Sequence, residues 1–292
     1  MSHILSWASK VNSLPFVNLI SPNASRMYNS EEKSGYLKTQ KLAMKCASEI
    51  AALIQEGWTE NYTATLMETW LRDNGVKTFF HKPFVWWGDR TRFNGVKTYW
   101  DYLPSQRRIV ENEIFILDVA PILDGYVADI GFSGCLGDHP GYDQGINFLS
   151  RLRHDLPILA SSIQSKSNLW STIDNLMKDA GYINIHATYP FGVLGHRLHK
   201  NVGSLEASFI HFGWQSYWEL LSRGLFGQLL NKDFAGDLRG LWAIEPHIGG
   251  DDFGLKFEEI LVVEDERAYW LDDAPCFHQK RQNVSGRVQC PN

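Results

Sequence analysis

Four acidic side chains lie in otherwise apolar, strand-like stretches of the sequence, and a histidine lies between the second and the third of them. These residues are Asp118, Asp129, His196, Glu245 and Glu258. An ionised carboxylate in an apolar strand is costly unless a cation lies close to it, and several such carboxylates also repel one another. A bound cation is the simplest way to make their burial tolerable. Four carboxylates and one imidazole suit two divalent metal ions, with Mn²⁺, Co²⁺, Zn²⁺ and Fe²⁺ as the candidates.

Asp118 and Asp129 are expected on the two strands of one hairpin. Asp129 follows Asp118 by eleven residues, and Asp124-Gly125 between them is typical of a two-residue hairpin turn. In an antiparallel pair this spacing can place the two carboxylates side by side. Two divalent ions about 3.5–4 Å apart can share a bridging water and polarise a substrate carbonyl. The pattern therefore predicts metal-assisted hydrolysis.

The composition of the chain favours one large globular domain. Its 292 residues can bury a core without disulfide support. Its four cysteines are expected to be free thiols, with a pairing of Cys276 and Cys290 as the alternative. The net charge of −5 argues against a nucleic-acid partner. No stretch approaches the roughly 20 apolar residues that span a bilayer, and the first residues lack the pattern of a secretory signal. A cytoplasmic location, with no membrane partner, is therefore expected.

The hydrophobic periodicity places these acids on strands between helices. We expect an irregular arm over residues 1–29, a catalytic domain over 30–272 and a tail over 273–292. Helical patterns cover residues 31–55, 59–74, 143–164 and 168–181, and an aromatic-rich helical insertion covers about 205–235. Strand patterns cover residues 82–87, 113–119, 126–132, 240–247, 256–264 and 268–271.

The order and the residues of these motifs resemble those of the group that contains methionine aminopeptidases, Xaa-Pro aminopeptidases, prolidases and creatinase. Ile244-Glu245-Pro246 and the run from Lys256 to Val263 carry the resemblance, which extends over about residues 30–272. It implies an α/β (α+β) pita-bread fold, in which a pseudo-symmetric, curved antiparallel sheet is flanked by helices.

The resemblance also implies a role for each ligand. Asp118 would hold one metal ion, Asp129 and Glu258 would bridge both ions, and His196 and Glu245 would hold the other. Glu245 would also act as the general base. Glu258 is preferred to Glu259 because the relatives place a ligand directly after the apolar residue of this strand, and alternation turns Glu259 to the opposite face.

Several positions depart from the pattern of these relatives. Gly203 stands where the peptidases carry a second histidine, so His199 and then His211 are candidates for its role, and His247 is expected near the metal ions. Residues 84–93 lack the upstream histidine of the peptidases, and His81 before them fits an ordinary strand-end residue. Arg90 and Arg92 are either exposed or available to an anionic group of the substrate. The candidate catalytic residues are thus Glu245, His199 and His247.

The resulting prediction is a dinuclear metallohydrolase, most readily an aminopeptidase or dipeptidase of the Xaa-Pro type acting on short peptides. One alternative uses the same metal site on a non-peptide C–N bond, or for oxidation by a di-iron form. Another is a binding module that has lost catalysis. The aromatic insertion could line a pocket, act as a lid or form a homodimer contact.

Overall fold

The computed structural model describes residues 27–162, 169–200, 229–234, 236–273 and 276–281. Its helices are α3 (Ser30–Ala51), α4 (Glu60–Asp73), α5 (Tyr99–Tyr102), α6 (Pro140–Ser162) and α7 (Leu169–Asp179), with 3-10 turns η1 (Gly88–Arg92), η2 (His186–Thr188) and η3 (Pro190–Gly192). Its strands are β1 (Thr78–Trp87), β2 (Glu113–Leu123), β3 (Tyr126–Val127), β4 (Ile130–Leu136), β5 (Ile183–Asn184), β6 (Gly195–Arg197), β7 (Leu229–Leu230), β8 (Gly240–Ile244), β9 (His247–Gly249), β10 (Gly254–Lys256), β11 (Glu259–Val263), β12 (Ala268–Trp270) and β13 (His278–Arg281).

The described strands form two larger sheets and one small one. The first runs β1-β2-β4-β13, with β3 paired to β2, and the second runs β12-β11-β8-β6-β7. The small sheet runs β10-β9-β5. An isolated antiparallel bridge between Gly131 of β4 and Glu258, just before β11, joins the two larger sheets.

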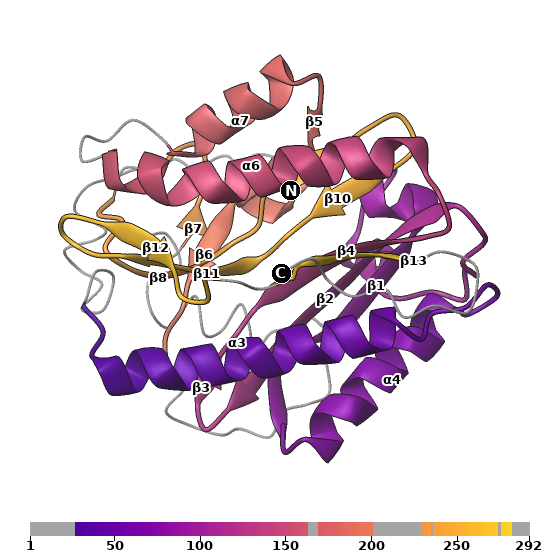
Figure 1. Cartoon of the computed structure of the whole chain (residues 1–292), viewed down its shortest axis with the longest axis horizontal. Coiled ribbons are helices and arrows are strands. Elements are labelled where there is room, and N and C mark those ends of the chain that lie inside the picture. Colours follow the sequence, from indigo (N-terminus) through magenta and orange to yellow (C-terminus); the bar gives the residue numbers. More distant parts are fainter. Residues whose placement is uncertain (1–26, 163–168, 201–228, 235, 274–275, 282–292) are drawn as a thin grey trace.

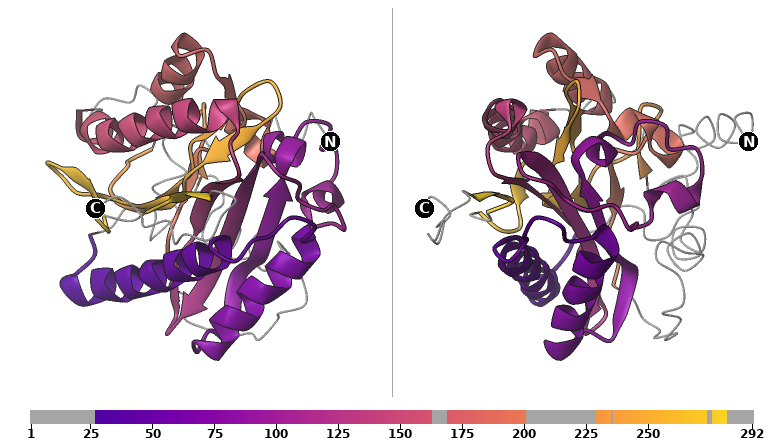
Figure 2. Two further views of the ribbon diagram at one scale, coloured as in Figure 1. Left: turned by 45° about the vertical axis from the view of Figure 1, so that its right-hand side comes forward. Right: turned by 90° about the vertical axis from the view of Figure 1, so that its right-hand side faces the viewer.

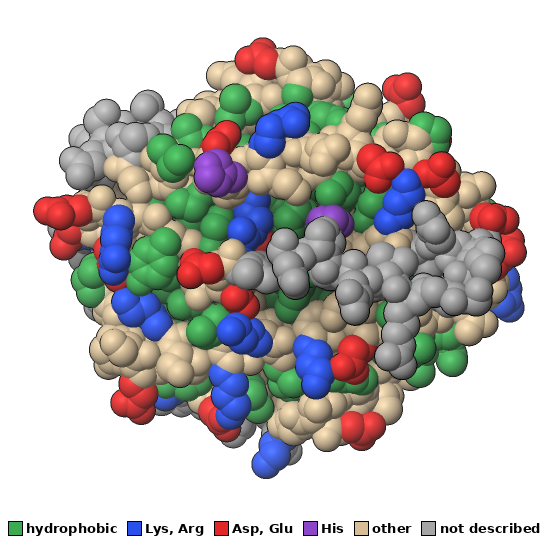
Figure 3. All heavy atoms as spheres, viewed as in Figure 1, with side chains coloured by type: hydrophobic (Ala, Val, Ile, Leu, Met, Phe, Trp, Pro, Cys, Tyr) green, Lys and Arg blue, Asp and Glu red, His purple; other side chains and the backbone are tan. Residues whose placement is uncertain are grey.

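The chain repeats one arrangement twice. Helices α3 and α4 precede the antiparallel strands β1, β2 and β4, and helices α6 and α7 precede β6, β8 and β11, which are also antiparallel. Helices α3 and α6 lie on the same side of the strands in different views (Figures 1 and 2). Charged side chains of both signs are interspersed over the face seen in Figure 3.

The helix boundaries follow from capping residues. Asn29 and Glu32 form a capping box at the start of α3, in which Asn29 Oδ1 accepts from the Glu32 backbone N–H at 2.8 Å. Thr59 caps α4 by accepting from the Tyr62 backbone N–H at 3.1 Å, and α4 ends before Gly75, which has φ +90°. Helix α3 ends at Ala51, before the expected Gln55.

Two expectations about smaller features have different outcomes. Asp124 and Gly125 both have positive φ values and connect β2 to β3, as predicted for a hairpin turn. Cys46 and Cys135 are buried free thiols, but Cys276 is disulfide-bonded, so the expectation of free thiols is wrong at that residue.

The ends of the predicted domain fall partly within the described residues. The segment expected as a tail contributes β13, which pairs parallel to β4. Most of the arm and of the 205–235 insertion lies outside the described residues, as do Gly203 and His211. None of the described helices combines the length and the apolar character required to cross a bilayer.

Candidate metal centre

The five ligands expected from the sequence converge where the two larger sheets meet. Asp118 lies on β2, Asp129 lies in the break between β3 and β4, and His196 lies on β6. Glu245 follows β8, and Glu258 lies between β10 and β11. All are buried except Glu245, whose side chain remains 12% exposed. Glu245 is therefore the most accessible of the four acids.

The hairpin places Asp118 and Asp129 on one face, but not directly opposite each other. In the β2–β4 register, Asp118 pairs with Gly131, two residues after Asp129. The two carboxylates are therefore diagonal neighbours on the same face. A side-by-side pairing was predicted, but the chain leaves the strand at Ala128 and Asp129, between β3 and β4.

His196 is oriented by a backbone carbonyl and an aromatic ring. Its Nδ1 lies 3.2 Å from the carbonyl oxygen of Arg197, and its Nε2 lies 3.1 Å from Oδ2 of Asp129. Phe80 stacks on the imidazole with ring centroids 5.1 Å apart. An Nδ1–H donated to a carbonyl directs the Nε2 lone pair of a neutral ring outward, which is the arrangement that metal-binding histidines use.

His81 also lies in this centre, which the sequence did not reveal. Its Nδ1 lies 2.9 Å from the carbonyl oxygen of Lys82, and its Nε2 lies 2.9 Å from Oδ1 of Asp129. The same Nε2 lies 3.3 Å from Oδ1 of Asp118. His81 is thus a buried residue of the centre and not an ordinary strand-end residue.

Lys256 is a second residue that the sequence did not single out. Its Nζ donates to Asp118 Oδ2 at 2.6 Å, to Glu245 Oε2 at 2.8 Å and to Glu258 Oε2 at 2.9 Å. The side chain is only 2% exposed. The Lys256 backbone is fixed by Ser133, whose Oγ accepts from its N–H at 2.9 Å and donates to its carbonyl at 2.7 Å.

The charges of the centre shift the pKa values of its members. Burial disfavours the protonated form of Lys256, but Asp118, Glu245 and Glu258 outweigh it and hold the pKa of Lys256 well above its usual value. Burial likewise opposes the protonation of His81, yet Asp129 and then Asp118 raise its pKa to about 9. Burial raises the pKa of Glu245 to about 7, although the charge of Lys256 acts in the opposite direction.

Three groups of side chains in the described part of the chain offer ligand atoms within 4.8 Å of one another. They are His81, Asp118 and Asp129; Asp129, His196 and Glu258; and Asp118, Glu245 and Glu258. Two nitrogen or oxygen ligands that lie about 2.0–2.2 Å from one ion, at right angles to each other, are about 3 Å apart. The Nε2 atoms of His81 and His196 lie 2.9 and 3.1 Å from the carboxylate oxygens of Asp129, which matches this spacing. Both histidine-containing groups therefore fit a divalent ion, whereas Lys256 already fills the third.

Glu259 turns away from the centre. Both of its carboxylate oxygens accept from Arg153 of α6, each at 2.7 Å. Because neighbouring residues of an extended strand point to opposite faces, Glu258 faces the centre while Glu259 faces the helix.

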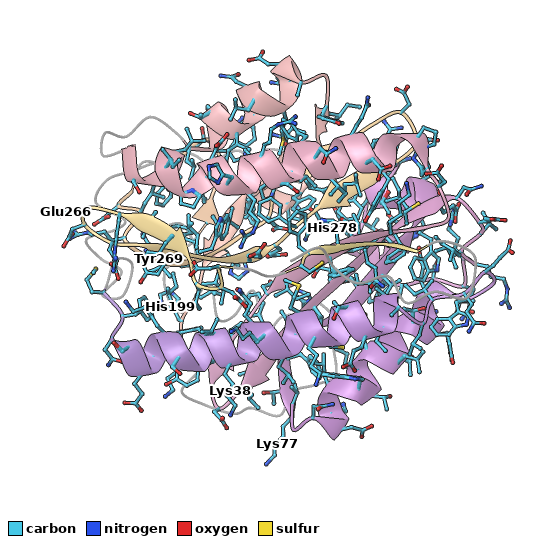
Figure 4. The ribbon with its side chains drawn as sticks, in the orientation of Figure 1. Lys38, Lys77, His199, Glu266, Tyr269 and His278 are labelled. Carbon is cyan, nitrogen blue, oxygen red and sulfur yellow. The ribbon has the colours of Figure 1, made fainter. Side chains whose placement is uncertain are left out.

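His247 and His199 are the other two candidate catalytic residues, and both are buried. His247 is buried beside Lys256 in the β9–β10 register, and its Nδ1 shares a 2.7 Å hydrogen bond with the Tyr189 hydroxyl. His199 follows Leu198, whose carbonyl oxygen accepts a hydrogen bond from the Tyr28 hydroxyl. His199 lies near the start of α3 (Figure 4). Among the described residues, neither histidine belongs to a metal-binding group, so their catalytic roles stay predictions.

The two arginines considered for anion binding make contacts within the protein. Arg90 Nε donates to Glu60 at 2.9 Å, and its Nη2 donates to the carbonyl of Leu103 at 2.8 Å. Arg92 donates to the carbonyl of Asp251. Arg90 therefore fixes η1 against α4 and the loop after α5.

Comparisons with known proteins agree with this architecture. A model of metallopeptidase family M24 matches residues 34–265. No curated protein sequence matches the chain. The fold is similar to that of an X-Pro aminopeptidase from Thermotoga maritima, with a TM-score of 0.58 and 16% identity over 87% of this chain and 64% of that one. The dipeptidase PepE from Mycobacterium ulcerans gives a TM-score of 0.63 and 17% identity over 91% of this chain and 63% of that one.

A methionine aminopeptidase from Rickettsia prowazekii matches at nearly its full length, with a TM-score of 0.55 and 12% identity over 85% of this chain and 99% of that one. The chain spans less than two thirds of the length of the X-Pro aminopeptidase and the dipeptidase. The fold predicted from the sequence is confirmed by these similarities and by the family match.

Proposed function

The chain belongs to metallopeptidase family M24, a family of metal-dependent hydrolases, and we propose that it hydrolyses an amide bond in short peptides. The observation that carries this proposal is the position of Asp129, whose two carboxylate oxygens face the Nε2 atoms of His81 and His196. Such mixed nitrogen and oxygen ligands, buried beside further carboxylates, suit a divalent ion.

Asp129, His196 and Glu258 would hold one divalent ion. An ion bound there supplies Lewis acidity toward a substrate carbonyl. The backbone contact of His196 Nδ1 and the stacked Phe80 fix the imidazole before any ion binds, so the ligand needs no reorientation.

Glu245 would move the proton during hydrolysis. It is the most accessible acid of the centre, and its pKa is raised to about 7 by burial, close to the value at which a general base works best near neutral pH. The hydrogen bond from Lys256 Nζ to Oε2 fixes the carboxylate and leaves Oε1 to accept a proton from water and pass it to the leaving amine.

The substrate class is proposed as short peptides of the Xaa-Pro type. The similarity to an X-Pro aminopeptidase and to prolidases supports this choice. The purified chain, loaded separately with Mn²⁺, Co²⁺, Zn²⁺ or Fe²⁺, should release the N-terminal residue from Xaa-Pro peptides. Failure with Xaa-Pro, N-terminal Met and N-terminal Pro substrates under all four metals would contradict a peptidase function.

A second candidate keeps the metal ions and acts on a non-peptide C–N bond, or oxidises its substrate in a di-iron form. Gly203, at the position where the peptidases carry a second histidine, motivates this candidate, and imidazole ligands are compatible with iron. Oxygen consumption by the iron-loaded protein, compared with the zinc-loaded protein, separates oxidation from hydrolysis.

We propose that the protein is a cytoplasmic enzyme that acts on peptides or other small molecules. We also propose that it forms a homodimer and binds neither nucleic acid nor a membrane. The buried free thiols of Cys46 and Cys135 support a reducing location, whereas the disulfide of Cys276 does not. Cell fractionation and light scattering on the purified chain test the location and the oligomeric state.

A further inference from the structure

We propose that His81 is a metal ligand and that a second divalent ion binds to His81, Asp118 and Asp129, because Lys256 occupies the alternative position among Asp118, Glu245 and Glu258. This inference rests on the metal-binding part of the proposed function. The resulting ligand set differs from the one expected from the sequence in two ways. His81 is added as a ligand, and Glu245 forms an ion pair with Lys256 in place of binding a metal ion.

Lys256 is built into its position. The ammonium group has three N–H donors, and each meets a carboxylate oxygen at 2.6–2.9 Å. The aliphatic part of the side chain passes over Gly131, where a Cβ atom would lie 2.5 Å from Lys256 Cε. A divalent ion among the same three carboxylates would have to displace the ammonium group. If the ammonium group remained, its positive charge would repel the ion.

His81 offers the geometry that a ligand needs. Its Nδ1 is anchored on a backbone carbonyl of the following residue, and its Nε2 faces Asp129, as in His196. The imidazoles of His81 and His196 therefore lie beside different oxygens of the Asp129 carboxylate. Such a carboxylate can bridge two ions, one beside each imidazole.

Asp118 has one buried oxygen that accepts no hydrogen bond within the described part of the chain. This oxygen is Oδ1, whereas Oδ2 accepts from Lys256. Oδ1 lies 3.3 Å from Nε2 of His81, on the side of the second ion. A buried carboxylate oxygen without a donor is costly, and an ion at this point removes the cost.

The formal charges are compatible with two ions. With His81 neutral, as a metal ligand must be, four carboxylates and the ammonium group of Lys256 leave three negative charges. Two divalent ions then leave a single positive charge, which an anionic group of the substrate or a hydroxide can neutralise.

The direct test is the metal content of the purified full chain. The metal-free protein is loaded with Mn²⁺, passed through a desalting column and analysed for bound metal. We expect about two ions in the wild type and about one in His81→Gln. The double variant His81→Gln/Lys256→Met should recover the second ion, because it frees the group of Asp118, Glu245 and Glu258. His278→Gln, on β13, is the matched control and should keep two.

Two ions retained in His81→Gln would overturn the inference, as would a double variant that stays at one. A variant that supplies a different ligand tests the same point by a positive signal. His81→Cys loaded with Co²⁺ should show a thiolate-to-cobalt charge-transfer band, and a folded, cobalt-loaded protein without this band would also overturn the inference. This band does not depend on the stability of His81→Gln.

The outcomes distinguish this inference from the proposed function. No bound ion in the wild type contradicts both. Two ions that depend on His81, in a protein that cleaves none of the tested peptides, contradict only the peptidase function.

Discussion

Gly131 and Lys256 are in close contact at the junction of the two larger sheets, and the absence of a side chain at Gly131 lets the lysine reach three carboxylates. A Cβ atom at residue 131 would also lie 3.2 Å from the backbone nitrogen of Glu258. The position of the lysine is therefore a property of two strands from different halves of the chain.

Gly131→Ala should displace Lys256 and change metal binding as well as stability. The added methyl group overpacks the junction, at a cost of roughly 1–3 kcal/mol in the free energy of unfolding. Gly134→Ala overpacks the same strand against Phe115 and is the control. Metal affinity should change in Gly131→Ala alone, while urea denaturation should show a loss of stability in both. Equal metal affinities in the two variants would contradict this role of Gly131.

Asp129→Asn should remove most of the bound metal and lower turnover by more than about 100-fold, because changes that only touch the surroundings of a ligand already cost 10–100-fold. The carboxylate faces both imidazoles, so no other single substitution should affect both ions equally. Asp174→Asn on α7, another buried acid, is the control. Metal analysis and peptide hydrolysis are the measurements, and an Asp129→Asn protein with two ions would refute the site.

Glu258→Gln and Glu259→Gln should have opposite effects, although the residues are adjacent. Glu258→Gln should lose metal, whereas Glu259→Gln leaves the half-buried Arg153 without its carboxylate and should cost roughly 1–3 kcal/mol of stability. Metal content and urea denaturation separate the two effects. Loss of metal in Glu259→Gln, with stability unchanged, would show that Glu259 and not Glu258 is the metal ligand.

Glu264 should make part of the stability dependent on pH. The hydrogen bond from Lys33 is the main cause that lowers its pKa from 4.5 to about 2, and Arg267 and Tyr269 add to it. Because the folded pKa is lower than the unfolded one, this contribution is full above about pH 4.5 and is lost as the pH falls toward 2.

Glu264→Gln should therefore lower the free energy of unfolding by about 1 kcal/mol near neutral pH, with a smaller difference at about pH 3. Glu266→Gln, in the same turn, is the control for an exposed acid. Urea denaturation at the two pH values is the measurement. A difference between Glu264→Gln and the wild type that does not change with pH would contradict this explanation.

The sequence singles out the five acidic and histidine side chains that converge in the structure, because each lies in a stretch whose apolar neighbours make a charge conspicuous. It also contained the signal for Lys256, which lies two residues before Glu258 and therefore on the same face of an extended chain. A lysine near carboxylates is more often a surface residue, so this spacing alone does not predict a buried ammonium group.

His81 could not be placed from the sequence in the same way. Strand β1 begins at Thr78, four residues earlier than expected, and its register with β2 shifts between Phe79 and His81 and again between His81 and Phe84. A β-bulge changes which face a side chain occupies, and nothing in the local pattern announced it. The parallel pairing of β13 with β4 was equally hidden, since it joins residues distant in the sequence.

The residues of the centre come from both halves of the chain. His81, Asp118 and Asp129 precede α6, whereas His196, Glu245, Lys256 and Glu258 follow α7. An ion shared between Asp129 and His196 must leave before the halves can separate, so cation release and global unfolding become one thermodynamic event. A chelator should then shorten the lifetime of the native state, and free metal in the medium should prolong it.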